Sequence, residues 1–163
     1  MEISMWIIPV AALVPLVMGF IWYHPKVLGT AWMKACGLTE EKIKGANMPV
    51  IFILSYVFAC LIASSMYGMT IHQFGVQSVL LDEPGFGEKG SEIHTYFQDF
   101  MTKYGTNFRT FKHGAFHGFL GSMLLVFPVI ATNSLFERKG WKYTWINTGY
   151  WVLTITLMGG LVC

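Results

Sequence analysis

Four long stretches of the chain lack Asp, Glu, Lys and Arg, and they alternate with more polar connections. A helix needs about 20 residues to cross the hydrocarbon core of a bilayer, and each stretch is long enough. The pattern therefore predicts four membrane-spanning helices, at residues 3–23, 49–69, 114–136 and 143–163.

The longest connection, residues 70–113, contains a turn-rich loop and then apolar residues at helical spacing. The positions between them are mostly polar, which predicts a two-faced helix. Beside membrane spans, its apolar face should lie in the membrane interface or cover the bundle. The apolar positions of this predicted helix are Ile93, Phe97, Phe100, Tyr104, Phe108 and Phe111.

Composition supports a membrane protein, because 54% of the residues are hydrophobic and only 12% are charged. The net charge of +2 and the short, scattered clusters of cations do not indicate a nucleic-acid partner. The cysteines, at 36, 60 and 163, show no paired spacing. We expect an all-α fold: one integral membrane domain over residues 1–163, built as a four-helix bundle with an extra amphipathic interfacial helix in the long outer loop.

The distribution of Lys and Arg predicts the orientation in the membrane. The connection at 24–48 carries Lys26, Lys34, Lys42 and Lys44, and the connection at 137–142 carries Arg138, Lys139 and Lys142. With four spans these two connections share a side, which the positive-inside rule assigns to the cytoplasm. Both termini and the connection 70–113 are then expected outside.

Two segments resemble a known family. WYHPKVLGTAWMKACGLTEEKIKGAN at 22–47 and NSLFERKGWKYTWINTGYWVLTITLMGG at 133–160 are similar to the signature regions of the DUF1761 family of small bacterial membrane proteins. The resemblance implies a four-span, multi-pass protein of the bacterial plasma (inner) membrane. The function of that family is not established, so the resemblance supplies no catalytic residue.

His113 and His117 are the strongest candidates for metal ligands. At i and i+4 of a helix, two imidazoles share one face and can hold one ion, but a zinc site needs a third protein ligand. His72, His94 and Asp99 are candidates for that ligand, and His72 completes the predicted metal set. The alternative is that the imidazoles form hydrogen bonds to the backbone or to water. We expect this alternative, and hence no cofactor.

Small residues predict where helices approach closely. Gly114, Gly118 and Gly121 lie in the third predicted span, and Gly159 and Gly160 lie in the fourth. Such positions let two helix backbones meet inside a membrane. We therefore expect these glycines to support helix packing or self-association.

A second group of polar residues is predicted at the inner side. Asn133 and Asn147 are almost equally far from the turn between the last two spans, so their amides should lie at a similar depth and could bond each other. A wider polar inner cluster would add Glu137, His24 and Tyr150. His117 is the one His within the predicted spans, which argues against a proton pump or an ion carrier.

The sequence contains none of the hydrolase, phosphate-loop or nucleotide-binding motifs that would indicate catalysis, so we expect no catalytic residue. An assembling or partner-binding, non-catalytic membrane subunit fits best, with the lipid bilayer around it and with copies of itself (a homo-oligomer) or a larger membrane complex as its partners. One alternative is a transporter or channel for a small neutral or apolar solute. Another is a metal-dependent membrane enzyme or sensor that uses the outer-face histidines.

Overall fold

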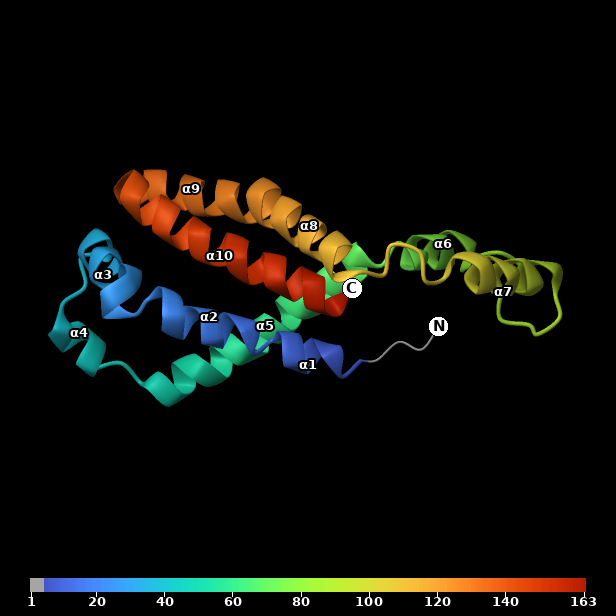
Figure 1. The fold of residues 1–163 in the computed structure, drawn as a ribbon, viewed down its shortest axis with the longest axis horizontal. Helices are drawn as coiled ribbons and strands as arrows, with labels where there is room; N and C mark the ends of the chain where they lie inside the picture. The colour runs from blue at the N-terminus through green and yellow to red at the C-terminus, as the bar shows by residue number, and fades with distance from the viewer. Residues whose placement is uncertain (1–4) are drawn as a thin grey trace.

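The computed structural model describes residues 5–163, and this part of the chain is helical with no strand. The first two residues of the predicted span at 3–23 lie outside it. In chain order (Figure 1), the elements are α1 (Ile7–Ala11), α2 (Val14–Trp22), the π-helical turn η1 (Pro25–Gly29), α3 (Thr30–Cys36), α4 (Glu40–Lys44), α5 (Met48–Thr70), α6 (Gln73–Leu80), α7 (Glu92–Tyr104), α8 (Phe111–Gly121), the π-helical turn η2 (Ser122–Val126), α9 (Phe127–Phe136) and α10 (Gly140–Val162).

Two helices of the described chain are long and apolar enough to cross a membrane. They are α5 and the continuous rod Phe111–Phe136, which runs through α8, η2 and α9. A third candidate is the pair Ile7–Trp22 and Pro25–Cys36, which is bent by 57°. The structure therefore supports a helical membrane protein with two to three such helices, and four equivalent spans are not confirmed.

The fourth predicted span, 143–163, corresponds to α10, which is not among the helices apolar enough to cross a membrane. It is the central helix of the fold, because it contacts α8, α9, α5, α2, α1 and α3. Thr144, Thr148 and Thr154 along it are buried. A helix covered by other helices need not be as apolar as one that faces lipid, and this explains the lower hydropathy of α10.

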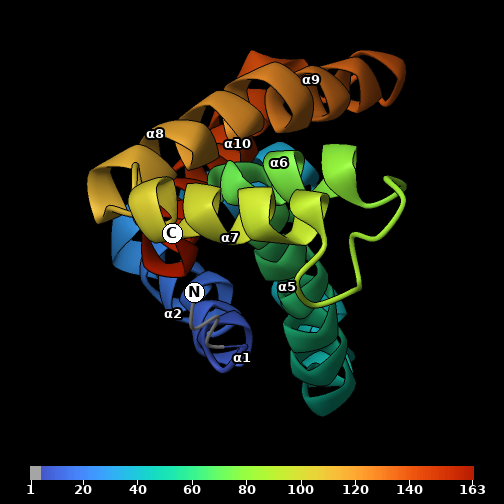
Figure 2. The ribbon, with the colours of Figure 1, turned by 90° about the vertical axis from the view of Figure 1, so that its right-hand side faces the viewer.

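α5 shows the opposite pattern. It exposes large apolar side chains, among them Phe52, Ile53 and Leu61. In the end-on view of Figure 2, α5 is inclined away from the rod of α8 and α9 and does not run alongside it. Its first half is therefore open to the surroundings, as expected for a helix that faces lipid.

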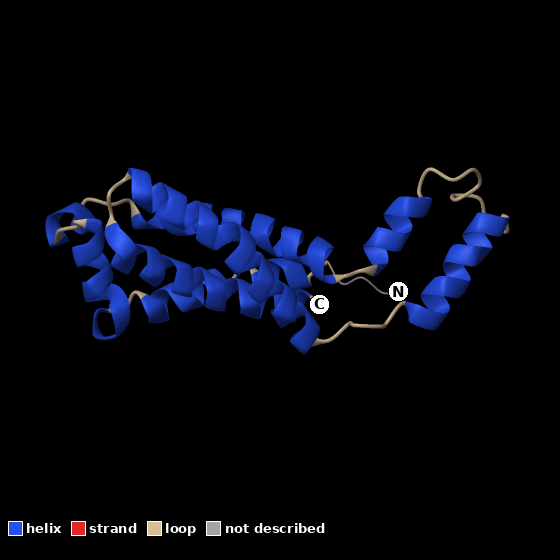
Figure 3. Ribbon diagram, turned by 90° about the horizontal axis from the view of Figure 1, so that it is seen from above, coloured by secondary structure: helices blue, strands red, loops and turns tan. Residues whose placement is uncertain are grey.

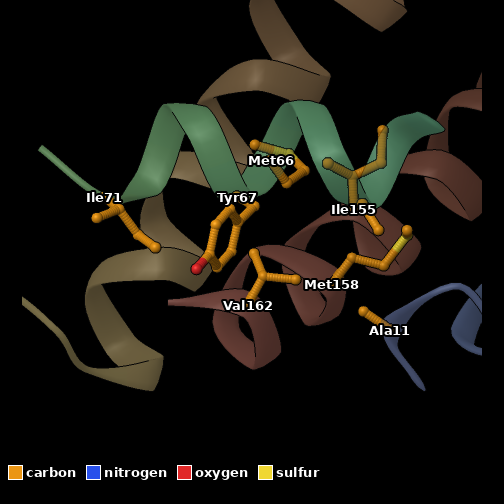
Figure 4. Close-up of a cluster of buried hydrophobic side chains, with 8 residues drawn as sticks. Ala11, Met66, Tyr67, Ile71, Ile155, Met158 and Val162 are labelled. Atoms are coloured by element: carbon orange, nitrogen blue, oxygen red, sulfur yellow. The ribbon is translucent and has the colours of Figure 1, made fainter. Parts of the chain in front are cut away.

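The main apolar cluster joins α1, α5 and α10 (Figure 4). Met66 and Tyr67 of α5 lie against Ile155, Met158 and Val162 of α10, with Ala11 and Ile71 at the margins. In this cluster Ala11 and Met158 are completely buried. The cluster lies near the end of α5, so it fixes the point from which α6 departs.

α6 and α7 form a hairpin that extends beyond the end of the bundle (Figures 1 and 3). Ile71 ends α5 with an extended backbone, and Ser91 begins α7 by accepting a hydrogen bond from the backbone N–H of His94 at 3.1 Å. Gln73 of α6 holds the far end of α7, because its Nε2 donates to the carbonyls of Tyr104 and Asn107.

The predicted interfacial helix is only partly present. Its aromatic stripe is helical as far as Tyr104, but Phe108 lies in the following loop with φ at 61°, and Phe111 begins α8. A bulky residue in the left-handed region cannot continue a right-handed helix. Since α7 pairs with α6 and projects from the bundle, a separate interfacial helix is not confirmed.

The two basic connections lie at the end opposite the hairpin. α3, α4 and the turn between α9 and α10 meet there (Figure 1). Lys139 Nζ donates to the carbonyl of Cys36 at 3.0 Å and so links the two connections. The chain thus has a basic end and a hairpin end.

Candidate metal centre

Three histidines meet at the hairpin end, and the first two come from α8. Thr110 begins this helix, since its side chain accepts a hydrogen bond from the backbone N–H of His113 at 3.3 Å. His117 follows one turn later on the same face, and the two ring centroids are 4.6 Å apart.

His72 reaches the pair from a different segment. It lies between α5 and α6, directly after the extended backbone of Ile71. Its Nε2 is 2.9 Å from the Nε2 of His113, although the two residues are 41 positions apart in the chain. The His72 ring centroid is also 4.9 Å from that of His117. The structure therefore brings together the three residues of the predicted metal set.

The donor atoms are close enough for one ion. One ring nitrogen of each histidine lies within 4.8 Å of the others. Zn–N bonds of about 2.0–2.1 Å place two tetrahedral ligands about 3.3 Å apart. This separation lies between the 2.9 Å that joins His72 and His113 and the 4.8 Å that bounds the set. The set contains no carboxylate or thiolate, and three imidazoles leave one position of a tetrahedral ion open.

The same geometry permits a simpler arrangement. A separation of 2.9 Å suits a hydrogen bond between one protonated and one unprotonated ring nitrogen of His72 and His113. The tautomers of the His72 and His113 rings decide which of the two nitrogens donates and which accepts. Such a bond joins two of the rings, whereas a metal would engage all three.

Phe108 lies over this group of histidines. Its ring centroid is 6.3 Å from that of His72 and 5.2 Å from that of His113. Its positive φ is costly for a residue with a side chain, and such strain often marks a functional site. His72 is exposed, whereas His113 and His117 are half-buried, so the group is open to the surroundings on one side.

The other two candidate ligands lie elsewhere. His94 is on α7, where its Nδ1 is 3.2 Å from the carbonyl of Phe86. Asp99 is exposed on the same helix. The hairpin that carries them projects from the bundle, which keeps both residues out of the histidine group.

The glycines beside the histidines face α10. A Cβ on Gly114 would collide with the carbonyl of Gly159, and one on Gly118 would collide with the carbonyl of Ile155. Gly160 lies under the ring of Phe111. Gly121 has more room, since its Cβ would be 3.8 Å from Met69 Cε. The close contacts of the predicted packing glycines thus occur within one chain.

At the basic end, Asn147 of α10 is the centre of a satisfied polar cluster. Its Oδ1 accepts from Tyr23 Oη at 3.0 Å and from Trp32 Nε1 at 3.2 Å. Its Nδ2 donates to the carbonyl of Tyr143 at 2.9 Å. Tyr150, whose ring is 5.1 Å from that of Tyr23, donates to the carbonyl of Pro15 at 2.8 Å.

Three residues expected in that cluster are not brought into it. Asn133 is exposed on α9, and the polar contact between α9 and α10 is made one position later, where Thr144 Oγ1 donates to Ser134 Oγ at 2.7 Å. One position turns a helix by about 100°, so Asn133 faces away from α10. Glu137 is exposed at the end of α9, and His24 Nδ1 accepts from the backbone of Lys26.

Sequence reasoning missed Tyr23 and Trp32 as partners of Asn147, and Gln73 and Phe108 beside the histidines. The aromatic pair of residues 22–23 marks the end of a span, but the bend at Pro25 that returns Trp32 to α10 has no periodic signal. Gln73 has no sequence signal beyond its nearness to His72, and Phe108 stands out in the sequence only as part of the predicted helical stripe.

The comparisons with known proteins agree with the segments quoted above. A family model described as "Protein of unknown function (DUF1761)" matches residues 6–163, which is essentially the whole chain. No curated protein and no solved structure matches the chain. The resemblance found in the sequence is thereby confirmed, and the chain belongs to the DUF1761 family.

Proposed function

We propose that this protein is a membrane metalloprotein that binds one divalent transition-metal ion, with Zn²⁺ as the best fit, through His72, His113 and His117. The observation that carries the proposal is the convergence of three imidazoles from two segments, with one ring nitrogen of each within 4.8 Å of the others. Two of them share a helix face by sequence alone, and the third is delivered by the turn after α5.

The donor set favours particular metals. Imidazole nitrogens suit Zn²⁺, Cu²⁺, Ni²⁺ and Fe²⁺, whereas Mg²⁺ and Ca²⁺ prefer oxygen ligands. The group contains only histidine. Structural zinc sites usually have four protein ligands, and sites with three keep a position for water or a ligand. Three histidines therefore support a site that binds a further molecule at the metal.

Metal analysis tests the proposal directly. Protein purified in mild detergent without chelator, or reloaded with Zn²⁺, should hold about one equivalent by elemental analysis. The double variant His113→Gln with His117→Gln should hold far less, because one imidazole cannot retain the ion alone. His94→Gln is the matched control, since His94 lies outside the group.

Two results would overturn the proposal. Less than a tenth of an equivalent in the reloaded wild-type protein would favour the hydrogen-bonded arrangement of His72 and His113. Equal metal in the wild type and in the double variant would place the ion elsewhere.

Self-association, the role that the sequence favoured, draws less support from the structure. Gly114, Gly118 and Gly159 make their close contacts between α8 and α10 of the same chain. These positions are therefore unavailable as a face for a second copy or a partner subunit.

We further propose that the protein lies in the bacterial inner membrane with its basic end in the cytoplasm. The support is the accumulation of Lys and Arg in the two connections that Lys139 links to Cys36. With the three cysteines replaced by Ser, Lys89→Cys and Lys42→Cys offer exposed thiols at opposite ends. An impermeant maleimide added to intact cells should label Lys89→Cys alone, and the reverse pattern would overturn the orientation.

A further inference from the structure

A cavity of about 440 Å³ lies beside the histidine group, between α6 and the C-terminal part of α7. Its walls are mainly apolar, with Val76 on α6 facing Phe100 and Tyr104 of α7. Gln73 keeps the two sides together through its bonds to the carbonyls of Tyr104 and Asn107. These bonds connect the two walls of the cavity close to the end of α5.

The cavity adjoins the histidine group through two side chains. His72 lines the cavity, and its Nε2 is 2.9 Å from His113 Nε2. Phe108 also lines the cavity, and its ring is 5.2 Å from that of His113. A molecule that fills the cavity would therefore end next to the donor nitrogens.

Charge selects the polar end of such a molecule. Three neutral imidazoles would leave Zn²⁺ with its full double charge and one open position. His113 lies in the first turn of α8, where the helix dipole also favours negative charge. No acidic residue is among the described residues that line the cavity. An anionic oxygen is thus favoured at the metal, and an apolar body in the cavity.

Resting on the proposed metal site, we infer that the cavity binds a small amphipathic carboxylic acid. Its carboxylate completes the coordination of the metal, and its aliphatic chain lies between Val76 and Phe100. A hydrocarbon chain suits this location, because the cavity lies next to the point where the apolar helix α5 ends and the apolar rod that starts with α8 begins.

Cobalt-substituted protein in phosphatidylcholine nanodiscs tests the inference, since Co²⁺ reports its own coordination by visible absorption. Octanoate should change the cobalt spectrum with at least about tenfold higher affinity than acetate, because methylene groups enter the cavity. Octanol, which has the chain without the carboxylate, should leave the spectrum unchanged.

Two variants of α6 test where the aliphatic chain of octanoate binds. Val76→Trp fills the cavity and should abolish the preference for octanoate over acetate, with cobalt binding retained. Val79→Trp is the matched control, because Val79 is 76% exposed and does not line the cavity. This control should keep the tenfold preference.

The outcomes separate the inference from the metal site. If the wild-type protein binds no Co²⁺, the metal site fails and this inference with it. If Co²⁺ binds but octanoate is no better than acetate, the inference alone fails, and this comparison needs no variant. If the preference for octanoate over acetate persists in Val76→Trp, the aliphatic chain of octanoate binds outside the cavity, and the inference is again overturned.

Discussion

The two faces of α8 that begin one residue apart in the sequence differ in what they contact. The glycine face, Gly114 and Gly118, lies against the backbone of α10 so closely that no Cβ fits. The histidine face, His113 and His117, meets the side chains of His72 and Phe108 and remains partly open. The comparison teaches that one helix can place a packing face and a proposed metal-binding face side by side, with an offset of about 100°.

The largest loss of stability is expected from a substitution on the glycine face. Gly118→Leu would drive a side chain into the carbonyl of Ile155, so α8 and α10 must separate. Overpacking of this kind costs about 3 kcal/mol at its usual upper end. Thermal unfolding in detergent should show a large loss of stability with or without metal. An unchanged melting temperature would mean that α8 does not contact α10 in this way.

The next largest loss of stability is expected from substitutions on the histidine face, and it should occur only when metal is present. At a free Zn²⁺ concentration a hundred times the Kd, binding stabilises the wild type by about 2.7 kcal/mol. His113→Gln with His117→Gln should lose that gain and, without metal, unfold within about 0.5 kcal/mol of the wild type. A large loss without metal would assign these histidines to packing.

Gly121→Ala sharpens the comparison, because Gly121 is a glycine of the same helix without the close contact. Its backbone is helical, and a Cβ would meet Met69 Cε and Met66 Cε at ordinary distances of 3.8 Å and 3.9 Å. The substitution should stabilise the protein by about 0.4–1 kcal/mol. Destabilisation similar to that of Gly118→Leu would extend the closed contact to this position.

The smallest effect is expected on the remaining side of α8. Phe119 is 45% exposed and lies away from both faces. Phe119→Leu should change the unfolding free energy by less than about 0.5 kcal/mol and leave metal content unchanged. A larger loss would reveal that this side is covered by another helix or chain.

The parts of the fold that depend on local pattern could be predicted from the sequence. Uninterrupted apolar runs predicted α5 and the rod of α8 and α9, because length and hydropathy decide whether a helix can cross a bilayer. Helical spacing likewise predicted that His113 and His117 share a face. The same reasoning predicted α10 to be a membrane span like the other three, because an apolar pattern does not show which helix is covered by the other helices of the fold.

The sequence by itself determined the apolar helices, the basic connections, the pairing of His113 with His117 and the family, since each is a property of neighbouring residues. Tertiary structure decided that His72, rather than His94 or Asp99, lies next to His113 and His117. It also decided that the side chain of Asn147 bonds to Tyr23 and Trp32 rather than to Asn133. The physical reason is that these contacts join residues far apart in the sequence. They depend on a few backbone angles, at Ile71 and at the bend between α2 and α3, because these angles set the direction of the following segment. Those angles are set by the packing of the whole chain and leave no period in the sequence.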